Sequence, residues 1–336
     1  MRVYLCLETR KAVLTMLISL LPDSPSKQGG KSDLPARITK AGSKQTYYII
    51  RFLMDRDRGQ DAFRAYAYFR WVDDQLDTSA STAEEKRAIL NRQCALLEAG
   101  YNGESPTIVC PEEQMLVDLV KNDTEKDSGL QAYLYNMMNV MEFDVERCGR
   151  LITQAELSQY TLWLSKAVTE YMFYFIGHDD PPPQSGVRYH AVSGAHVAHM
   201  LRDMLGDIEL GYINIPAEVL ENGRISLDHF GEPTIRKWVF ERVQLAHEYF
   251  DKGRKYISRV ENFRCRLAGF SYLARFEWML RAIEQDQYCL RPEYPERKHL
   301  SAALWMAWSV IRSFLNFPRV KYIPPEPFTL SDHCEE

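Results

Sequence analysis

Long stretches of helical apolar periodicity make up most of the chain, and they constrain its fold more than any other feature. Apolar side chains recur three and four residues apart, which places them on one face of an α-helix. β-branched residues form only short clusters inside these stretches, and no set of segments alternates as strands do. The pattern predicts an all-α protein with helices at residues 60–78, 83–99, 112–122, 130–147, 155–177, 189–210, 233–260, 263–287 and 297–316.

Segments of different composition flank these helices, so we expect one helical domain over residues 38–317. Residues 1–37 combine an apolar run with a linker rich in Pro, Ser and Gly. That run is too short to span a bilayer, and no clear small-residue cleavage site follows it. We therefore interpret residues 1–37 as an extension and linker, and residues 318–336, which contain four prolines, as an extended tail.

Charge and cysteine usage exclude several classes of protein. The 336 residues include 41 Lys and Arg against 46 Asp and Glu, a net charge of −5, so no global positive field favours nucleic acid. Seven scattered cysteines without a CxxC pair argue against a disulfide framework or a thiolate zinc site, and they favour a cytoplasmic location. The apolar stretch at 302–311 is read as core packing, with peripheral membrane contact as the alternative. The sequence indicates no oligomeric state.

Two pairs of aspartates are the most distinctive chemical feature. Asp73 and Asp77 form the first pair, and Asp203 and Asp207 form the second; each lies late in a predicted apolar helix. A spacing of four residues puts both carboxylates of a pair on one helical face, one turn apart. Like charges at this spacing repel, so each pair costs helix stability unless a cation binds between them.

A divalent cation is the ligand that this pattern favours. Mg²⁺ prefers hard oxygen ligands and keeps positions for water and phosphate oxygens. Arg70 and Arg202 stand three residues and one residue before the first aspartate of their pairs, and they could help to neutralise a diphosphate. Two such pairs facing each other across a helical cavity would hold several ions. The 19 Tyr, 15 Phe and 6 Trp could line such a cavity and stabilise a carbocation.

Two other interpretations of the aspartate pairs compete with this one. A single pair could be a solvated helix face, but two pairs within aromatic-rich helices favour metal binding. A di-iron carboxylate site needs Glu-x-x-His on two helices, and Glu142 and Glu170 lack a histidine three residues later.

The ordered motifs resemble the squalene/phytoene synthase family, the head-to-head branch of the all-α isoprenoid synthases. The resemblance runs from about Ser43 to Lys298. Residues 43–48 are similar to the family's opening Ser-x-Ser-Phe-Tyr stretch, and residues 65–77 to its first aspartate-rich motif. Residues 201–207, followed by Gly211 and Ile215-Pro216, look like the second motif and its exit. The resemblance implies a single-domain helical bundle around a central cavity.

The resemblance also implies a reaction. Two farnesyl or geranylgeranyl diphosphates would bind with Mg²⁺ and condense through a cyclopropyl diphosphate to a squalene- or phytoene-like product. NADPH stays open as a cofactor, because only the squalene-type product requires reduction. The implied metal ligands are the four aspartates Asp73, Asp77, Asp203 and Asp207. The other implied site residues are Arg70, Arg202, Ser43 and Tyr47, which would contact the diphosphates, and Tyr160 and Tyr288, which would line the cavity.

The second motif departs from the family pattern. His196 and His199 stand where the family has Gln and Asn, and an imidazole is a poorer Mg²⁺ ligand than a carbonyl oxygen. Tyr212 replaces the arginine of the family's Gly-Arg-x-Tyr-x-Pro, which removes a cation expected to meet diphosphate. Gly206 replaces a usual acid.

These departures leave three functions open. The first is the family's own condensation. The second is a diverged reaction that prenylates another acceptor or cyclises one prenyl diphosphate. In it, His196 and His199 would take protons or contact substrate, unless they only pack in the helix. The third is a non-catalytic prenyl-lipid binding protein, against which two complete aspartate pairs argue.

Overall fold

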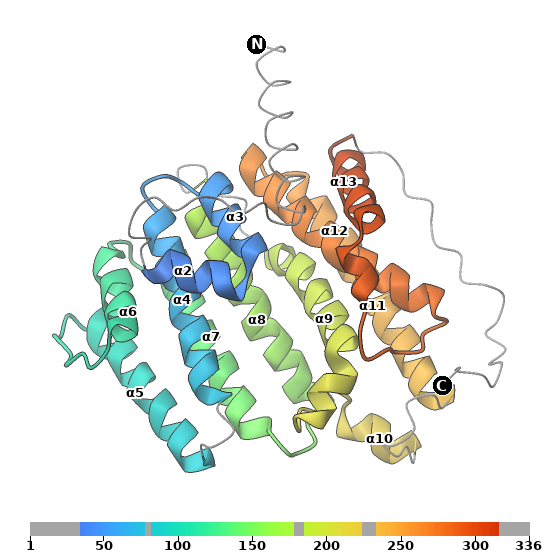
Figure 1. Cartoon of the computed structure of the whole chain (residues 1–336), viewed down its shortest axis with the longest axis horizontal. Coiled ribbons are helices and arrows are strands. Elements are labelled where there is room, and N and C mark those ends of the chain that lie inside the picture. The colour runs from blue at the N-terminus through green and yellow to red at the C-terminus, as the bar shows by residue number, and fades with distance from the viewer. Residues whose placement is uncertain (1–33, 78–81, 178–184, 224–232, 316–336) are drawn as a thin grey trace, which may run out of the picture. The chain divides into compact units, whose positions relative to one another are not determined.

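The computed structural model describes residues 34–77, 82–177, 185–223 and 233–315, and within these ranges its regular structure is entirely helical (Figure 1). The predicted all-α class is confirmed, and each of the nine predicted helices is present with its ends within three residues of the prediction. The expectations for residues 1–33 and 316–336 lie outside the described residues. The elements are α2 (Leu34–Gly42), α3 (Lys44–Leu53), α4 (Gly59–Leu76), α5 (Ala83–Tyr101), α6 (Pro111–Asn122), α7 (Gly129–Arg147), α8 (Gln154–Phe175), η1 (Gly186–Tyr189), α9 (His190–Glu209), α10 (Ala217–Gly223), α11 (Pro233–Ile257), α12 (Phe263–Gln285), η2 (Pro295–Lys298) and α13 (Leu300–Phe314).

Polar side chains determine where some helices begin. Thr82 and Glu85 form a reciprocal capping box at the start of α5, with the Glu85 amide 3.2 Å from the Thr82 hydroxyl oxygen. Ser43 caps α3 by accepting a hydrogen bond from the Thr46 amide at 3.2 Å. The helix α3 was not predicted, because a segment of only ten residues carries little periodic signal.

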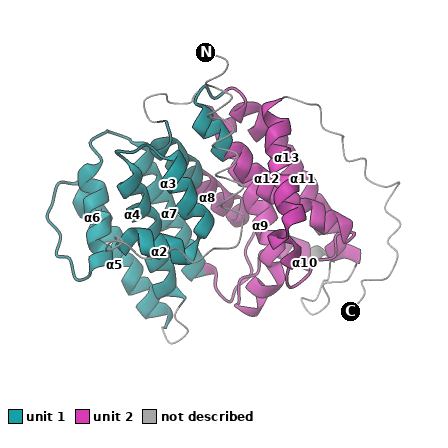
Figure 2. Cartoon of the chain, turned by 45° about the horizontal axis from the view of Figure 1, so that its top comes forward, with its two compact units in different colours: residues 1–146, 166–183, 260–268 teal, residues 147–165, 184–259, 269–336 magenta. Residues whose placement is uncertain are grey.

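The chain divides into two compact units (Figure 2). Unit 1 consists of residues 1–146, 166–183 and 260–268, and unit 2 consists of the remaining residues. The helices α8 and α12 each contribute residues to both units, and the last residue of α7, Arg147, belongs to unit 2. The first aspartate pair belongs to unit 1 and the second to unit 2.

In unit 1, buried tyrosines hold the helix α4 in place. The hydroxyl of Tyr171, on α8, donates to the Ala62 carbonyl at 2.9 Å, and that of Tyr133, on α7, donates to the Ala65 carbonyl at 3.3 Å. The two tyrosine rings lie 5.0 Å apart. Because both hydroxyls are hydrogen-bonded, α7 and α8 bury these aromatic side chains against α4 without leaving the hydroxyls without a partner.

A buried carboxylate joins α4, α5 and α6. Glu113 is 1% exposed and accepts hydrogen bonds from Arg92 at 2.6 and 2.8 Å, from Gln93 at 3.2 Å and from the Val109 amide at 2.9 Å. Gln93 in turn accepts from the buried Tyr68 hydroxyl at 3.1 Å. Burial alone would raise the pKa of Glu113, but these donors outweigh it and lower the pKa.

We expect Glu113→Gln to lower the free energy of unfolding at pH 7 by about 2 kcal/mol, because charge-assisted hydrogen bonds are lost in a buried site. The folded pKa lies below the unfolded one, so the stabilisation is complete above pH ~4.5 and disappears as pH falls through the folded value. Urea denaturation should therefore show that the difference in the free energy of unfolding between wild type and variant is smaller at pH 3 than at pH 7. Glu112→Gln, at the partly exposed neighbouring position, is the control. An equal difference at both pH values would contradict this role.

In unit 2, α9 packs against α11 with unusually close backbones. A β-carbon built at Gly253 would lie 2.6 Å from the Ala191 amide nitrogen, and one at Gly194 would lie 2.8 Å from the Phe250 ring. Glycine is therefore needed at both positions for α9 to sit where it does. The second aspartate pair is carried by this tightly held helix.

The cysteines are not all free thiols. Cys94, Cys110, Cys148 and Cys265 are free, whereas Cys289 is disulfide-bonded.

Candidate active site

The first aspartate pair lies at the C-terminal end of α4. Asp73 and Asp74 occupy its last turn and Asp77 is its C-cap, and this turn contains no basic residue. The negative end of the helix dipole makes this a poor place for carboxylates. Arg70, one turn earlier, offsets part of this charge by donating to Asp73 at 3.1 Å and to Asp74. The cluster remains short of positive charge.

The ionisation of Asp73 reflects that shortage. Burial first, and then the carboxylate of Asp77, raise the pKa of Asp73 to about 6, although Arg70 opposes the shift. A divalent cation would remove the repulsion between Asp73 and Asp77. The donor set of this aspartate pair therefore fits Mg²⁺.

Ser43 is connected to this cluster through a tyrosine that sequence reasoning missed. Tyr66 hydrogen-bonds to Ser43 and lies one turn before Arg70 on α4. Burial raises the pKa of Tyr66, and Arg70 and Ser43 act in the opposite direction. The signal available in the sequence was the helical spacing of Tyr66, Arg70 and Asp73, which places them on one face.

Tyr47 lies among other rings in unit 1. Its ring centroid is 5.4 Å from that of Tyr48 and 5.5 Å from that of Phe63, and the Lys40 ammonium lies 5.5 Å from its centre. Lys40 thus places a cation over Tyr47, a contact that the sequence did not suggest.

The first carboxylate of the second aspartate pair, on α9, already has an arginine and a histidine beside it. Arg202 donates to both oxygens of Asp203, with Nε at 2.6 Å from Oδ1, and His199 Nε2 lies 2.8 Å from Oδ2. Burial alone would raise the pKa of Asp203, but His199 and Arg202 hold it well below its usual range. Asp203 is therefore an ionised carboxylate throughout the neutral pH range.

Asp207 has a different environment. Its Oδ2 accepts a hydrogen bond of 2.8 Å from the side-chain amide of Asn214, and its carbonyl accepts one of 2.8 Å from the Tyr212 amide. Burial and the charge of Asp203 raise the pKa of Asp207, while His199, Arg147 and Asn214 oppose the shift. The pKa values of the two aspartates of this pair are thus shifted in opposite directions.

The two histidines of α9 also differ. His196 is 4% exposed, its Nδ1 lies 3.1 Å from the Thr161 hydroxyl, and burial with nearby cations lowers its pKa to about 3. His196 is therefore a neutral imidazole packed in unit 2, as in the packing alternative. His199 is about half-exposed and pairs with Asp203.

The structure places the two predicted cavity tyrosines in different surroundings within unit 2. The ring of Tyr160 lies 5.0 Å from that of His196 and 4.8 Å from the Arg147 guanidinium. Tyr288 lies in the turn after α12 with φ +66°, is 2% exposed and packs on Phe240. Tyr160 is thus close to the second motif, whereas the burial of Tyr288 leaves little of its surface for a ligand.

Each motif offers a pair of carboxylates rather than a complete ligand cage. In the part of the chain that the structure describes, no group of three or more His, Cys, Asp or Glu side chains could hold a metal ion by itself. Mg²⁺ commonly binds through one or two carboxylates and completes its octahedron with water and phosphate oxygens. The carboxylate pairs suit that mode.

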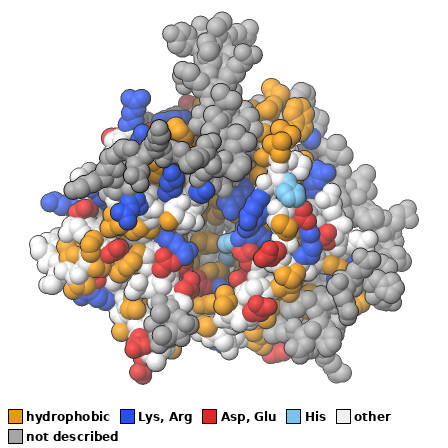
Figure 3. All heavy atoms as spheres, viewed as in Figure 1, with side chains coloured by type: hydrophobic (Ala, Val, Ile, Leu, Met, Phe, Trp, Pro, Cys, Tyr) orange, Lys and Arg blue, Asp and Glu red, His pale blue; other side chains and the backbone are white. Residues whose placement is uncertain are grey.

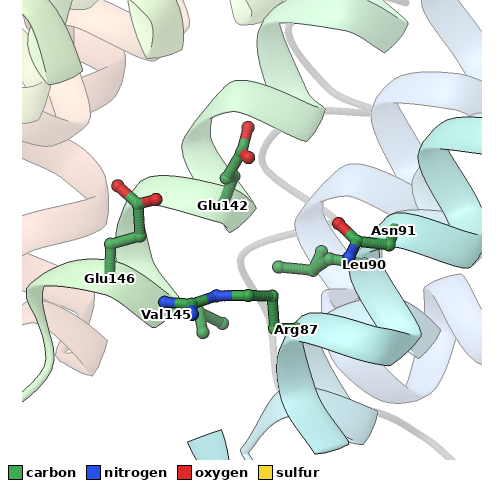
Figure 4. A pocket seen from close by; sticks show the side chains of 6 residues that line it. All are labelled: Arg87, Leu90, Asn91, Glu142, Val145 and Glu146. Atoms are coloured by element: carbon green, nitrogen blue, oxygen red, sulfur yellow. The ribbon is translucent and has the colours of Figure 1, made fainter. Parts of the chain in front are cut away.

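A pocket of about 370 Å³ lies elsewhere in unit 1, and none of the predicted site residues lines it. Figure 4 shows α5 and α7 contributing its lining, with two glutamates from one helix and an arginine and an asparagine from the other. The lining residues are Arg87, Leu90, Asn91, Glu142, Val145 and Glu146.

Comparison with known proteins adds a sequence relative. A presqualene diphosphate synthase of Zymomonas mobilis subsp. mobilis (strain ATCC 31821 / ZM4 / CP4) is 26% identical over 197 residues. The match covers 59% of this chain and 64% of that protein, so this chain matches under two thirds of the relative's length.

Two solved structures share the fold. The squalene synthase HpnC of Alicyclobacillus acidocaldarius has a TM-score of 0.61 at 20% identity, covering 76% of this chain and 94% of that chain. A dehydrosqualene synthase solved in complex with a ligand has a TM-score of 0.66 at 16% identity, covering 84% and 96%. The sequence profile of the squalene/phytoene synthase family matches residues 39–303, most of the chain. This protein therefore belongs to the squalene/phytoene synthase family.

Proposed function

We propose that this protein is a Mg²⁺-dependent prenyltransferase that condenses two allylic prenyl diphosphates head to head. The observation that carries the proposal is the presence of two aspartate pairs, each with its own arginine, in a member of the squalene/phytoene synthase family. The relative from Zymomonas mobilis is a presqualene diphosphate synthase, and we propose a product of the same chemical type. Farnesyl and geranylgeranyl diphosphate are the candidate substrates.

In the proposed reaction, the carbon–oxygen bond at C1 of one substrate breaks and diphosphate leaves. The double bond of the second substrate captures the allylic cation, and loss of a proton closes a cyclopropane ring. Mg²⁺, when bound, neutralises the diphosphate and so favours its departure.

The chain's own residues supply the binding groups. Asp73 and Asp77, and Asp203 and Asp207, would bind the metal ions through carboxylate oxygens. Arg70 and Arg202 place guanidinium donors beside these carboxylates for the diphosphate oxygens. The diverged alternative, in which the histidines act as bases, gains no support from His196, which packs on Tyr160 and Thr161.

Product analysis tests the proposal. The full-length protein is incubated with Mg²⁺ and either farnesyl or geranylgeranyl diphosphate, with and without NADPH, and products are identified by mass spectrometry. A doubled hydrocarbon or its cyclopropyl diphosphate is expected, and it should be lost in Asp73→Asn and Asp203→Asn. Diphosphate release without a doubled product would instead indicate cyclisation or hydrolysis, and inertness toward both substrates would also refute the condensation.

We further propose that α13 brings the enzyme to an anionic membrane surface. Ala302, Met306 and Val310 are buried on one face of α13, whereas Leu304 and Trp308 are 57% and 54% exposed on another. In Figure 3, hydrophobic side chains gather over α13, with a histidine and basic side chains beside them. The described residues include no helix that is long and apolar enough to cross a membrane.

Charge favours a lipid surface as the occupant of this face. Arg297, Lys298 and His299 are exposed directly before Leu300, which is itself 65% exposed. Basic residues next to an apolar helix face, with a tryptophan on it, are typical of interfacial helices that bind anionic lipids. A prenyl hydrocarbon product would also be poorly soluble in water, so release at a membrane would suit the proposed reaction.

We expect Trp308→Glu and Leu304→Glu each to lower flotation with phosphatidylglycerol-containing vesicles by at least about fivefold. Each substitution removes an apolar side chain that would enter the lipid and adds a negative charge that the anionic lipid repels. Val109→Glu, at a 69% exposed apolar residue of unit 1, is the matched control and should float as wild type does. Wild-type protein that stays in the bottom fraction would refute membrane contact. Light scattering would then show whether a second copy of the chain covers this face.

A further inference from the structure

Arg147 is a buried cation next to the second aspartate motif. Its side chain belongs to unit 2 and is 6% exposed. The guanidinium carbon lies 4.8 Å from the ring centre of Tyr160 and 4.9 Å from that of Tyr212. Its Nη1 donates a hydrogen bond of 2.7 Å to the side-chain oxygen of Asn214. A buried charge is costly unless hydrogen bonds and opposite charge compensate it. These contacts therefore compensate the cost of burying the Arg147 guanidinium.

Asn214 connects that cation to a carboxylate. It is 2% exposed, and its side-chain NH₂ donates to Asp207 Oδ2 at 2.8 Å while its oxygen accepts from Arg147. Only one amide orientation works here, because the reversed amide would face NH₂ to the guanidinium and oxygen to the carboxylate. The amide therefore holds Arg147 and Asp207 in fixed positions relative to each other.

The backbone keeps the two turns that carry these residues together. The Gly149 amide donates to the Gly211 carbonyl at 2.9 Å, and Gly211 has a φ of +89° that other residues rarely adopt. A β-carbon at Gly211 would also lie 3.4 Å from the Gly149 nitrogen. The turn after α7 is thus hydrogen-bonded to the turn after α9, and this contact keeps Arg147 beside Tyr212.

This arrangement places a cation beside the stretch that departs from the family pattern. Tyr212 occupies the position of the arginine in the family pattern, and Asn214 that of its tyrosine. Arg147 comes from the end of α7, 67 residues before Asn214, and its guanidinium lies against the Tyr212 ring. A cation from a different helix therefore lies against the tyrosine that replaces the arginine, but it is buried and bonded to Asn214.

We propose that Arg147 is a positioning residue that acts through Asn214 to orient the Asp207 carboxylate. The Asn214 contact occupies Oδ2 of Asp207, so Oδ1 is the oxygen that would meet a Mg²⁺–diphosphate complex. This inference rests on the metal-binding role proposed above for Asp207, but on neither the prenyl substrate nor the product.

Binding of inorganic pyrophosphate in the presence of Mg²⁺, measured by isothermal titration calorimetry on the full chain, tests the inference. Arg147→Met and Asn214→Leu should each weaken binding about 10- to 100-fold, the usual cost of removing a partner that orients a metal ligand. The double variant should bind about as weakly as either single variant, because both remove the same arrangement. Arg147→Lys should restore part of the affinity.

Arg150→Gln is the control, since Arg150 lies three residues further on and pairs with Glu156 at 2.8 Å; its affinity should match that of wild type. Circular dichroism and thermal melting establish that each variant is folded. If Arg147→Met does not fold, Asn214→Leu decides, because it keeps the charge of Arg147 and removes only the connection.

Two binding results would overturn the inference: wild-type affinity in folded Asn214→Leu, or effects of the two substitutions that simply add. Absence of pyrophosphate binding by the wild-type protein would overturn it too. Failure of the proposed condensation can be distinguished from failure of this inference. In that case the variants would still weaken pyrophosphate binding as expected, but mass spectrometry would find no doubled product.

Discussion

Replacing Asp73 with asparagine is expected to lower the turnover number about 10³-fold and to leave the metal-free protein as stable as wild type or more stable. The turnover number falls because the substitution removes one carboxylate of a metal-binding pair. A cation bound there would stabilise the transition state, in which diphosphate departs, by several kcal/mol. The opposite effect on stability follows from the charge cluster at the end of α4, where Asp73 and Asp77 repel each other.

The sign of the stability effect depends on the pKa of Asp73. Burial and Asp77 raise it to about 6, so the folded protein binds this proton more tightly than the unfolded chain does. The metal-free wild type should therefore lose stability as pH rises from about 4 to about 6, and Asp73→Asn should remove that loss.

Steady-state kinetics and metal-free thermal melts at pH 5 and pH 7 measure both effects. Asp118→Asn, at a partly exposed aspartate on α6, is the control for each. An Asp73→Asn enzyme that retains a third or more of the wild-type rate would contradict the metal-ligand role.

Replacing Gly253 with alanine is expected to lower the free energy of unfolding by about 1–3 kcal/mol, the cost of overpacking a tight contact. The added methyl group would lie 2.6 Å from the Ala191 nitrogen, so α9 would have to move away from α11. The usual gain from alanine over glycine in a helix, about 1 kcal/mol, offsets only part of this cost. Because α9 carries Asp203 and Asp207, activity should fall as well.

Gly206→Ala provides a matched control on α9 itself. No atom lies within 4 Å of a β-carbon built at Gly206, so the same substitution should stabilise the protein by about 0.5–1 kcal/mol. Urea denaturation of both variants gives the comparison. If Gly253→Ala also gained stability, the close approach of α9 and α11 could not be a requirement of the fold.

The helices and the aspartate pairs were predictable because they depend on local spacing. Apolar periodicity located α4 and α9 to within two residues at each end, since a helical face is set by residues three and four apart. The four-residue spacing of Asp73 and Asp77 places both carboxylates on one face of any helix that contains them.

Residues that act through distant contacts were not predictable. His196 and His199 are three residues apart, yet one is buried against Thr161 and the other is half-exposed beside Asp203. Neither composition nor periodicity distinguishes them, because burial depends on which helix packs over each side chain.

The sequence by itself determined the helical class, the positions of the helices and the carboxylate pairs, because each follows from interactions within a few residues along one chain segment. Only the tertiary structure brought Arg147 to Asn214 and Asp207, since 67 residues separate Arg147 from Asn214 and no local spacing relates them. Their contact depends on the joined turns at Gly149 and Gly211, which exist only when unit 2 has folded.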